Sequence, residues 1–389
     1  MINRSSEHGA VSLFIVIFTM VLISVLTVSF VRVMISDQQR ATAADLSQSA
    51  YDSAQAGVED AKRALLACEA GDVSVCQALE TDSCTMLQDA GISTFVTTEG
   101  GNREVPIQTS VASDNDQALD QAYTCVKVEA DTTDYPGVLT IGDSQMIPLR
   151  GTKSFTSVQL SWFSYEDISS AAPGADHSVS LPTPLPSADG TQYLYTQDNW
   201  PTNRPSLIRA QLIQFNTTGF NLNSFDKPDE GSNASTLFLY PGAGLPTKSF
   251  DLDGRQDSTN APEVVKCVND LSAEAYACTV TLQLPEPIGG DENNRAAYLR
   301  LSSLYNNTHY TLSLKNDGGE TVRFDNVLPA VDSTGRANDQ FRRVESRINL
   351  LGDFPYPEYA VDVDGGFCKN FVVTDNASDN PNGAACTTP

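Results

Sequence analysis

Histidine is scarce in this chain, and the patterns of the common catalytic sites are missing. Only three histidines occur among 389 residues, too few to build several common catalytic and metal sites. The nucleophile pattern Gly-x-Ser-x-Gly, the zinc-protease pattern His-Glu-x-x-His and the phosphate-binding loop are all absent. We therefore expect a protein that is not an enzyme. The alternative is an anchored hydrolase whose carboxylate pair is hidden among the 49 acidic residues.

Basic residues are also few. The chain has 24 lysines and arginines against 49 aspartates and glutamates, and its formal net charge is −25. Proteins that bind nucleic acid use lysine and arginine to displace counterions from the phosphates. We therefore expect no nucleic-acid partner. The acidity indicates a soluble, self-repelling extracellular surface, and it is compatible with a cationic partner or with Ca²⁺.

Two short acidic loops have oxygen ligands at alternating positions before glycine, a spacing that suits Ca²⁺. The first contains Asp251, Asp253 and Asp257, and the second contains Asp362 and Asp364. Neither has the distal glutamate of a complete EF-hand loop, and aspartate followed by glycine is common in ordinary turns. They are weak Ca²⁺ candidates, and we expect no required metal or cofactor.

The eight cysteines show no Cys-x-x-Cys pair and none of the close spacings of zinc sites. All of them follow residue 67. We therefore expect disulfides, which form on the oxidising side of a membrane. Cys267 and Cys278 lie at the two ends of a short loop between strand-like runs, and we expect them to pair across a hairpin.

One stretch, Val11–Val31, has twenty-one residues without charge, proline or glycine. A bilayer core about 30 Å thick needs roughly 20 apolar helical residues to cross it. The serines and threonines in the stretch are tolerated because their hydroxyls can bond to the helix's own carbonyls. The stretch is too long for the apolar part of a secretory signal. It predicts a single membrane span.

The helical pattern continues beyond the span. From Arg32 to Ala67 there are nine alanines, no proline and one glycine, Gly57, and alanine is the best helix former. We expect one helix over residues 10–69, on the order of 90 Å long at about 1.5 Å per residue. Its second half is amphipathic. The expected buried stripe consists of Ala44, Ser47, Tyr51, Ala54, Val58, Ala61 and Leu65.

A short polar leader ending in Gly9, an uncharged span and an amphipathic continuation under a large C-terminal region resemble the type IV pilin and pseudopilin superfamily. The resemblance covers residues 1–69 and, more loosely, a β-rich head. It implies a leader peptide, residues 1–9, that a prepilin peptidase removes between Gly9 and Ala10. It also implies methylation of the new amino terminus of Ala10.

The resemblance also bears on the remaining cysteines. Many pilin heads tie their C-terminal tail with a disulfide, which implies a Cys368–Cys386 pair here. Three pairings are then open for the other four cysteines, Cys68, Cys76, Cys84 and Cys125.

The chain departs from the major pilins at two positions after the predicted cut. Phe14 stands where they have a glutamate, and Ala10 stands where they have phenylalanine or methionine. In a filament that glutamate is thought to neutralise a neighbour's amine, which would otherwise be a costly unpaired charge in apolar surroundings. Members that lack it are chiefly large minor pilins and tip pseudopilins. The 389-residue length agrees with such a subunit.

Strand-like runs separated by glycine, proline, asparagine and aspartate fill the rest of the chain, which predicts an antiparallel sandwich. In one run we expect Val126 and Val128 on one face and Tyr123 and Cys125 on the other. The predicted fold class is α+β, a long helix followed by a disulfide-bonded β-rich head. The expected parts are a leader (1–9), the helix (10–69), a first β-rich part (70–167), a Ser/Pro-rich linker or loop (168–190) and a second β-rich part (191–389).

These expectations describe a non-catalytic minor subunit of a type IV pilus or related filament, at or near the tip, active in assembly priming and surface adhesion. Its expected partners are other pilin subunits, the assembly machinery, the prepilin peptidase, the membrane and a host or cell-surface ligand. The aromatic residues Tyr193, Tyr195 and Trp200 form either a ligand-facing platform or a loop packed on the head, and packing is favoured. The alternative function is a single-pass extracellular binding protein that never polymerises.

Overall fold

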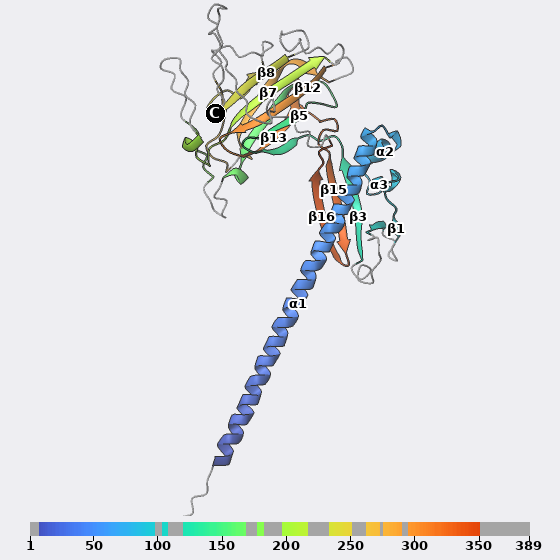
Figure 1. Cartoon of the computed structure of the whole chain (residues 1–389), viewed down its shortest axis with the longest axis vertical. Coiled ribbons are helices and arrows are strands. Elements are labelled where there is room, and N and C mark those ends of the chain that lie inside the picture. The colour runs from blue at the N-terminus through green and yellow to red at the C-terminus, as the bar shows by residue number, and fades with distance from the viewer. Residues whose placement is uncertain are drawn as a thin grey trace, which may run out of the picture. The chain divides into compact units, whose positions relative to one another are not determined.

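The structure of the chain is a computed structural model, and it shows an α+β fold (Figure 1). One long N-terminal helix is followed by a large β-rich region that contains three disulfides. The chain divides into two compact units. Unit 1 comprises residues 1–135, 150–152 and 322–350, and unit 2 comprises residues 136–149, 153–321 and 351–389. The described residues are 8–97, 103–107, 120–168, 177–182, 197–216, 233–250, 262–272, 275–289 and 295–350.

Helix α1 (His8–Glu69) is unbroken over 62 residues, as the alanine-rich sequence predicts. It is long and apolar enough to cross a membrane, and none of its most apolar window is buried within the protein. At its C-terminal end, Gly71 has a positive φ of 98° and its N–H donates to the carbonyl of Cys68. Glycine adopts this conformation without a steric penalty, so the helix ends here.

Two short helices follow α1 in unit 1, α2 (Val73–Leu79) and α3 (Met86–Asp89). Asp72 caps α2 by accepting hydrogen bonds from the backbone N–H groups of Ser74 and Val75. Disulfides join Cys68 to Cys76 and Cys84 to Cys125. The first ties α1 to α2, and the second ties the α2–α3 connection to a strand of the sheet.

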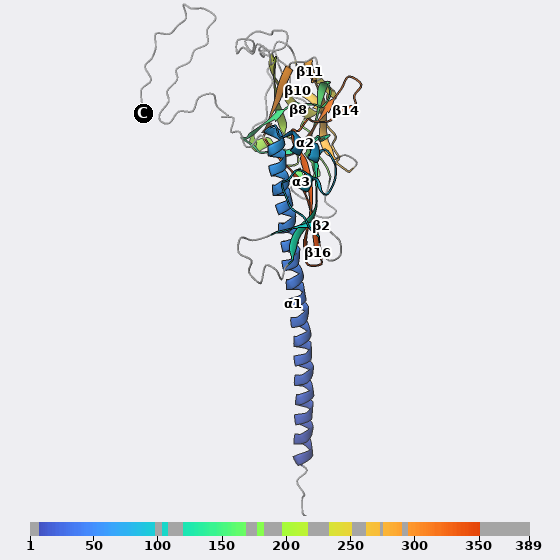
Figure 2. The same ribbon diagram turned by 90° about the vertical axis from the view of Figure 1, so that its right-hand side faces the viewer.

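The sheet of unit 1 is antiparallel and has the strand order β1-β2-β3-β15-β16. Its strands are β1 (Val96–Thr97), β2 (Arg103–Pro106), β3 (Gln121–Glu129), β15 (Ala330–Ala337) and β16 (Gln340–Arg347). The second half of α1 lies along one face of β3, β15 and β16, and the helix and these strands are side by side in both views (Figures 1 and 2). The hydrophobic core of unit 1 lies between them.

One expectation for β3 is wrong. The register opposite β15 skips Thr124, because Thr334 pairs with Cys125 and Gly335 pairs with Tyr123. Such a bulge moves the preceding side chain to the other face of a sheet. Tyr123 is therefore buried on the same side as Val126, against α1, rather than on the opposite face.

Unit 2 contains two sheets. One has the order β10-β8-β7-β12-β5, and the other has the order β14-β13-β6-β11-β9 with β4 added beside β13. Most neighbours are antiparallel, but the short edge strands β10 and β9 run parallel to β8 and β11. The strands are β4 (Tyr135–Leu139), β5 (Ser144–Pro148), β6 (Phe155–Ser164), β7 (Leu207–Asn216), β8 (Asn233–Gly242), β9 (Thr247–Ser249), β10 (Glu263–Lys266), β11 (Tyr276–Ile288), β12 (Arg295–Leu304), β13 (Thr308–Lys315) and β14 (Thr321–Val322).

Alternating apolar and polar residues give these strands one buried face and one more exposed face. In β11, Cys278, Val280 and Leu282 are buried, while Thr279 and Thr281 are only partly covered. Two single-turn helices, η1 (Tyr165–Asp167) and η2 (Gln197–Asn199), complete the described elements of unit 2.

The Ser/Pro-rich segment 168–190 does not mark the division between the two units. The chain passes between them near residues 135, 149, 152 and 321. The described parts of the segment, residue 168 and residues 177–182, belong to unit 2, where the N–H of Val179 donates to the carbonyl of Asn269. The reason for the difference is that β15 and β16, made late in the sequence, return to cover α1.

Candidate functional site

The candidate functional site is the surface of α1, and its first half is bare. From Leu13 to Ile35, every large apolar side chain is exposed, by 48 to 74 %. Phe14 is the most exposed of them at 74 %. A helix that is apolar all round and uncovered needs either lipid or other apolar helices around it.

The second half of α1 is covered by the sheet, and small residues make the contact. Gly335 of β15 lies so close to α1 that a Cβ atom there would be 2.2 Å from both the carbonyl oxygen of Ala50 and the nitrogen of Ala54. A Cβ atom on Gly57 of the helix would be 2.4 Å from Ser333 Oγ. The buried small residues of this helix face are Ala50, Ser53, Ala54, Gly57, Ala61 and Ala64.

A polar interaction lies within this contact. The buried Tyr123 hydroxyl donates to Asp60 Oδ2 at 2.7 Å, and Arg63 Nη1 donates to Asp60 Oδ1 at 2.7 Å. Burial raises the pKa of the Tyr123 phenol, and the Asp60 carboxylate raises it further. Tyr123 therefore stays protonated and serves as a hydrogen-bond donor that fixes the register of α1 on β3.

Between the two halves lies a neck, residues 36–46, where α1 extends below the sheet. An uncharged groove of about 490 Å³ runs along one side of it. The groove is lined by Ile35, Gln38, Gln39, Thr42, Ala43 and Leu46 of α1 and by Gln340 at the start of β16. The lining of the groove itself therefore contains no charged side chain.

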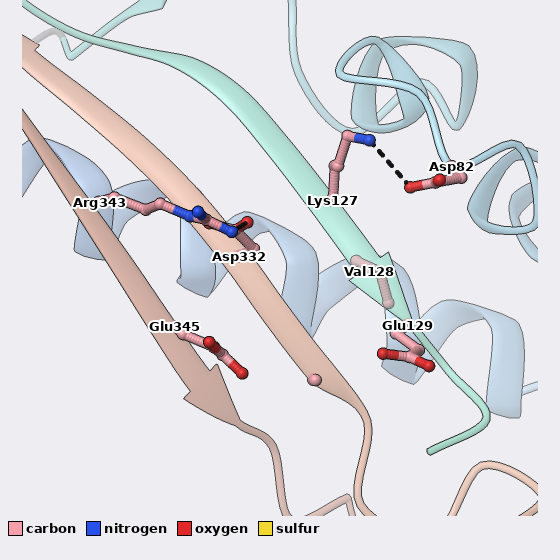
Figure 3. A pocket seen from close by; sticks show the side chains of 8 residues that line it. Asp82, Lys127, Val128, Glu129, Asp332, Arg343 and Glu345 are labelled. Carbon is pink, nitrogen blue, oxygen red and sulfur yellow. Dashed lines mark hydrogen bonds and ion pairs between the residues drawn. The ribbon is translucent and has the colours of Figure 1, made fainter. Parts of the chain in front are cut away.

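The opposite face of the sheet carries charged side chains around a hollow of about 230 Å³ (Figure 3). Lys127 Nζ donates to Asp82 Oδ1 at 3.1 Å, and Arg343 Nε donates to Asp332 Oδ1 at 2.7 Å. Glu345 also lines the hollow. Most of the charge around the hollow is paired within the unit, and such exposed pairs contribute little to stability.

A buried ion pair joins β2 to β15. Arg336 donates from Nε and Nη2 to the two carboxylate oxygens of Glu104, at 3.0 and 2.8 Å, and from Nη1 to Asp120 at 2.7 Å. The hydrogen bonds that Arg336 donates to Asp120 and Glu104 raise the pKa of Arg336, and the bond that Asp120 accepts lowers the pKa of Asp120. Sequence reasoning missed this group, because the partners lie more than 200 positions apart.

The structure places the predicted cysteine pairs that fall in its described part. Cys267 and Cys278 are joined, the hairpin pairing expected from the sequence. Cys68 pairs with Cys76 and Cys84 with Cys125, which is one of the three open alternatives. Cys368 and Cys386 lie outside the described residues.

Only some of the other predicted site residues lie in the described part of the chain. Gly9 and Ala10 lie in the first turn of α1. The Ca²⁺ candidates Asp251, Asp253, Asp257, Asp362 and Asp364 lie outside the described residues, as do Tyr193 and Tyr195. Within residues the structure describes, no cluster of three or more His, Cys, Asp or Glu side chains is arranged to hold a metal ion.

Trp200 packs rather than forming a platform. It is only 5 % exposed, stacks on Tyr305 with 4.4 Å between ring centroids, and is covered by the Arg204 guanidinium at 5.0 Å. This is the packing that the sequence favoured over a ligand-facing surface.

Comparison with models of protein families, with curated proteins and with solved structures found no match to this chain.

Proposed function

We propose that this chain is a non-catalytic, minor pilin-like subunit of a type IV pilus or related filament, placed at or near its tip. One observation carries the proposal: a single unbroken helix is bare from Leu13 to Ile35, is uncharged as far as Val31 and is covered by a sheet from Ala50 onward. A helix that served only to fill a core would have no reason to extend about 34 Å without cover, at about 1.5 Å per residue.

The proposed working cycle follows from these two halves. The bare half is stored in a membrane as a single span, with the β-rich units on the oxidising, extracytoplasmic side where disulfides persist. A prepilin peptidase removes residues 1–9, and neighbouring subunits then replace lipid around the bare half. The head remains at the cell surface, where it primes assembly and contacts an adhesion partner. No nucleic acid and no cofactor is part of this proposal.

We also propose that the two sheets of unit 2 pack face to face as a sandwich. Trp162 Nε1 of β6 donates to the carbonyl of Ser206, next to β7, at 3.0 Å. Gln214 Nε2 of β7 donates to the carbonyl of Glu286 of β11 at 3.0 Å. Both bonds join one sheet to the other, and this supports aligned packing.

Mass spectrometry of the mature amino terminus tests the proposed function. In cells that make a prepilin peptidase, we expect the chain to begin at a methylated Ala10. A Gly9→Leu variant is the control, because it should keep Met1 while leaving the folded units unchanged. A wild-type chain that retains Met1 in such cells contradicts the filament proposal.

One observation favours a second function, a membrane-anchored binding protein that does not polymerise. Phe14 cannot form the charge pair with a neighbour's amine that a shaft subunit makes. Shearing of surface filaments separates the two functions. A filament subunit is released with the sheared fibres, whereas an anchored binding protein stays with the membrane.

A further inference from the structure

The hydroxyl groups of the bare half of α1 are already bonded within the helix. Thr19 Oγ1 donates to the carbonyl of Val16 at 2.9 Å, and Ser24 Oγ donates to that of Met20 at 2.8 Å. Thr27 and Ser29 donate in the same way at 3.0 and 2.8 Å. Polar side chains join membrane helices by bonding across the interface. These four have their donors committed to their own backbone.

The bare half also lacks the pattern of small residues that lets two helix backbones approach. Val11–Val31 contains no glycine and no alanine, and no two of its serines and threonines are four positions apart. Spacing of small residues by four is the common dimerisation pattern of membrane helices. Here bulky side chains point outward on all sides, including Phe14, Phe18 and Phe30 at 74, 62 and 71 % exposure.

The covered half of the same helix shows the opposite design. Gly57, Ala61 and Ala64 face the sheet and lie at spacings of three and four, and the strands approach the helix backbone closely. Glycine and alanine of α1 are therefore buried where the sheet packs on the helix and are absent from Val11–Val31. The contrast lies in one continuous helix, so it does not come from a difference in secondary structure.

We propose that the bare half of α1 has no self-association face, so that the membrane-embedded form of this chain is a monomer surrounded by lipid. The inference rests on the membrane span of the proposed function and adds how the stored form is kept. Transfer of such a helix from lipid to a bundle of apolar helices breaks no hydrogen bond. The partner therefore needs to supply only apolar side chains, and self-association does not compete with it.

Energy transfer between labelled copies in vesicles tests this inference. Full-length chain is labelled at its N-terminus with donor or acceptor and reconstituted in phosphatidylcholine and phosphatidylglycerol over a wide range of lipid-to-protein ratios. We expect the wild-type signal to match that of randomly distributed monomers. The Val21→Gly/Val25→Gly variant, which creates two glycines four apart, should raise the dimer fraction roughly tenfold.

A matched variant controls for glycine content. Val21→Gly/Leu22→Gly has the same number of glycines on different sides of the helix and should remain monomeric. A wild-type chain that transfers energy as strongly as the Val21→Gly/Val25→Gly variant overturns the inference. Failure of the chain to enter the vesicles at all would instead count against the membrane anchor, so the two failures are distinguishable.

Discussion

The two halves of α1 share one backbone and differ in what surrounds them. From Leu13 to Ile35 the helix has large side chains on every side and no protein cover, whereas from Ala50 to Leu65 it presents small side chains to a sheet. One continuous helix can suit two environments, an apolar one and a protein core, if its side chains change along its length. The size of the side chains, as much as their polarity, therefore distinguishes the half that a sheet of the same chain covers from the half that it leaves bare.

The largest effect is expected from the disulfide that ties the α2–α3 connection to β3, one of the strands β3, β15 and β16 that cover α1 and are called the cover below. Cys84→Ser with Cys125→Ser removes a cross-link over 41 positions, which should lower the free energy of unfolding of unit 1 by about 4 kcal/mol. Hydrogen exchange measured by mass spectrometry should show faster exchange over residues 50–65. Cys267→Ser with Cys278→Ser, in unit 2, is the control and should leave that segment protected.

Gly335→Val should displace the cover directly. The added side chain collides with the backbone of α1 at Ala50 and Ala54, and overpacking of this kind lowers the free energy of unfolding by about 3 kcal/mol. A urea titration followed by exchange over residues 50–65 measures it. Thr334→Val, on the other face of β15, should change the midpoint little. Equal effects of the two variants would contradict close packing at Gly335.

Membrane insertion of the bare half should be sensitive to an added charge. Val21→Lys places an ammonium near the middle of the span, where insertion becomes less favourable by about 2.5 kcal/mol. Carbonate extraction should release more of this variant from membranes than of the wild type. Gln55→Lys, on the exposed side of the covered half, is the matched control. If both variants extract alike, the two halves do not face different solvents.

The smallest expected effect is a pH dependence of the free energy of unfolding of unit 1, which the bare half of α1 does not share. Arg336 lowers the pKa of Asp120, so the pair stabilises unit 1 above the ordinary aspartate pKa of about 3.9 and less as the pH falls through the lowered value. Asp120 is 59 % exposed, so the difference from Asp120→Asn should stay below about 1 kcal/mol at pH 7.

The measurement is the wild-type minus Asp120→Asn difference in urea midpoint at pH 7, 5 and 3. The difference should shrink at pH 3, where the wild-type carboxyl becomes protonated. Val11–Val31 has no ionisable side chain, so exchange in that segment, corrected for intrinsic rates, should not follow pH. A difference that grows on acidification would show that the sign is wrong.

The helix could be predicted well from the sequence because its signals are local. Alanine content and the uncharged run predict residues 10–69, and α1 is His8–Glu69. The buried stripe was predicted only in part. Ala54 and Ala61 are buried as expected, but Tyr51 is 40 % exposed. Tyrosine would not fit where the sheet approaches the helix backbone.

Of the three strands that cover α1, β3 and β16 fall in runs that the sequence predicts as strands, but β15 could not be predicted, for a physical reason. Its central strand, β15, reads AVDSTGRA and lacks the alternation of large apolar residues that marks a strand. Ser333 and Gly335 are small because α1 lies against them. The reason for the small residues of β15 is thus its contact with α1, about 280 positions earlier in the sequence. Local sequence patterns do not reveal a contact at that separation.

The order of the strands in the sequence has a consequence for how the chain is made. β15 and β16 are the last described strands, yet they flank β3 and close over a helix that is synthesised first. During synthesis, the alanine-rich face of α1 is made long before the strands that cover it, and residues 70–329 must be added before β15 and β16 can pack on it. A chain that stops short of Ala330 would keep α1 and lose β15 and β16. The second half of α1 would then be uncovered, so a truncated chain would differ from a full one in the exposure of this helix.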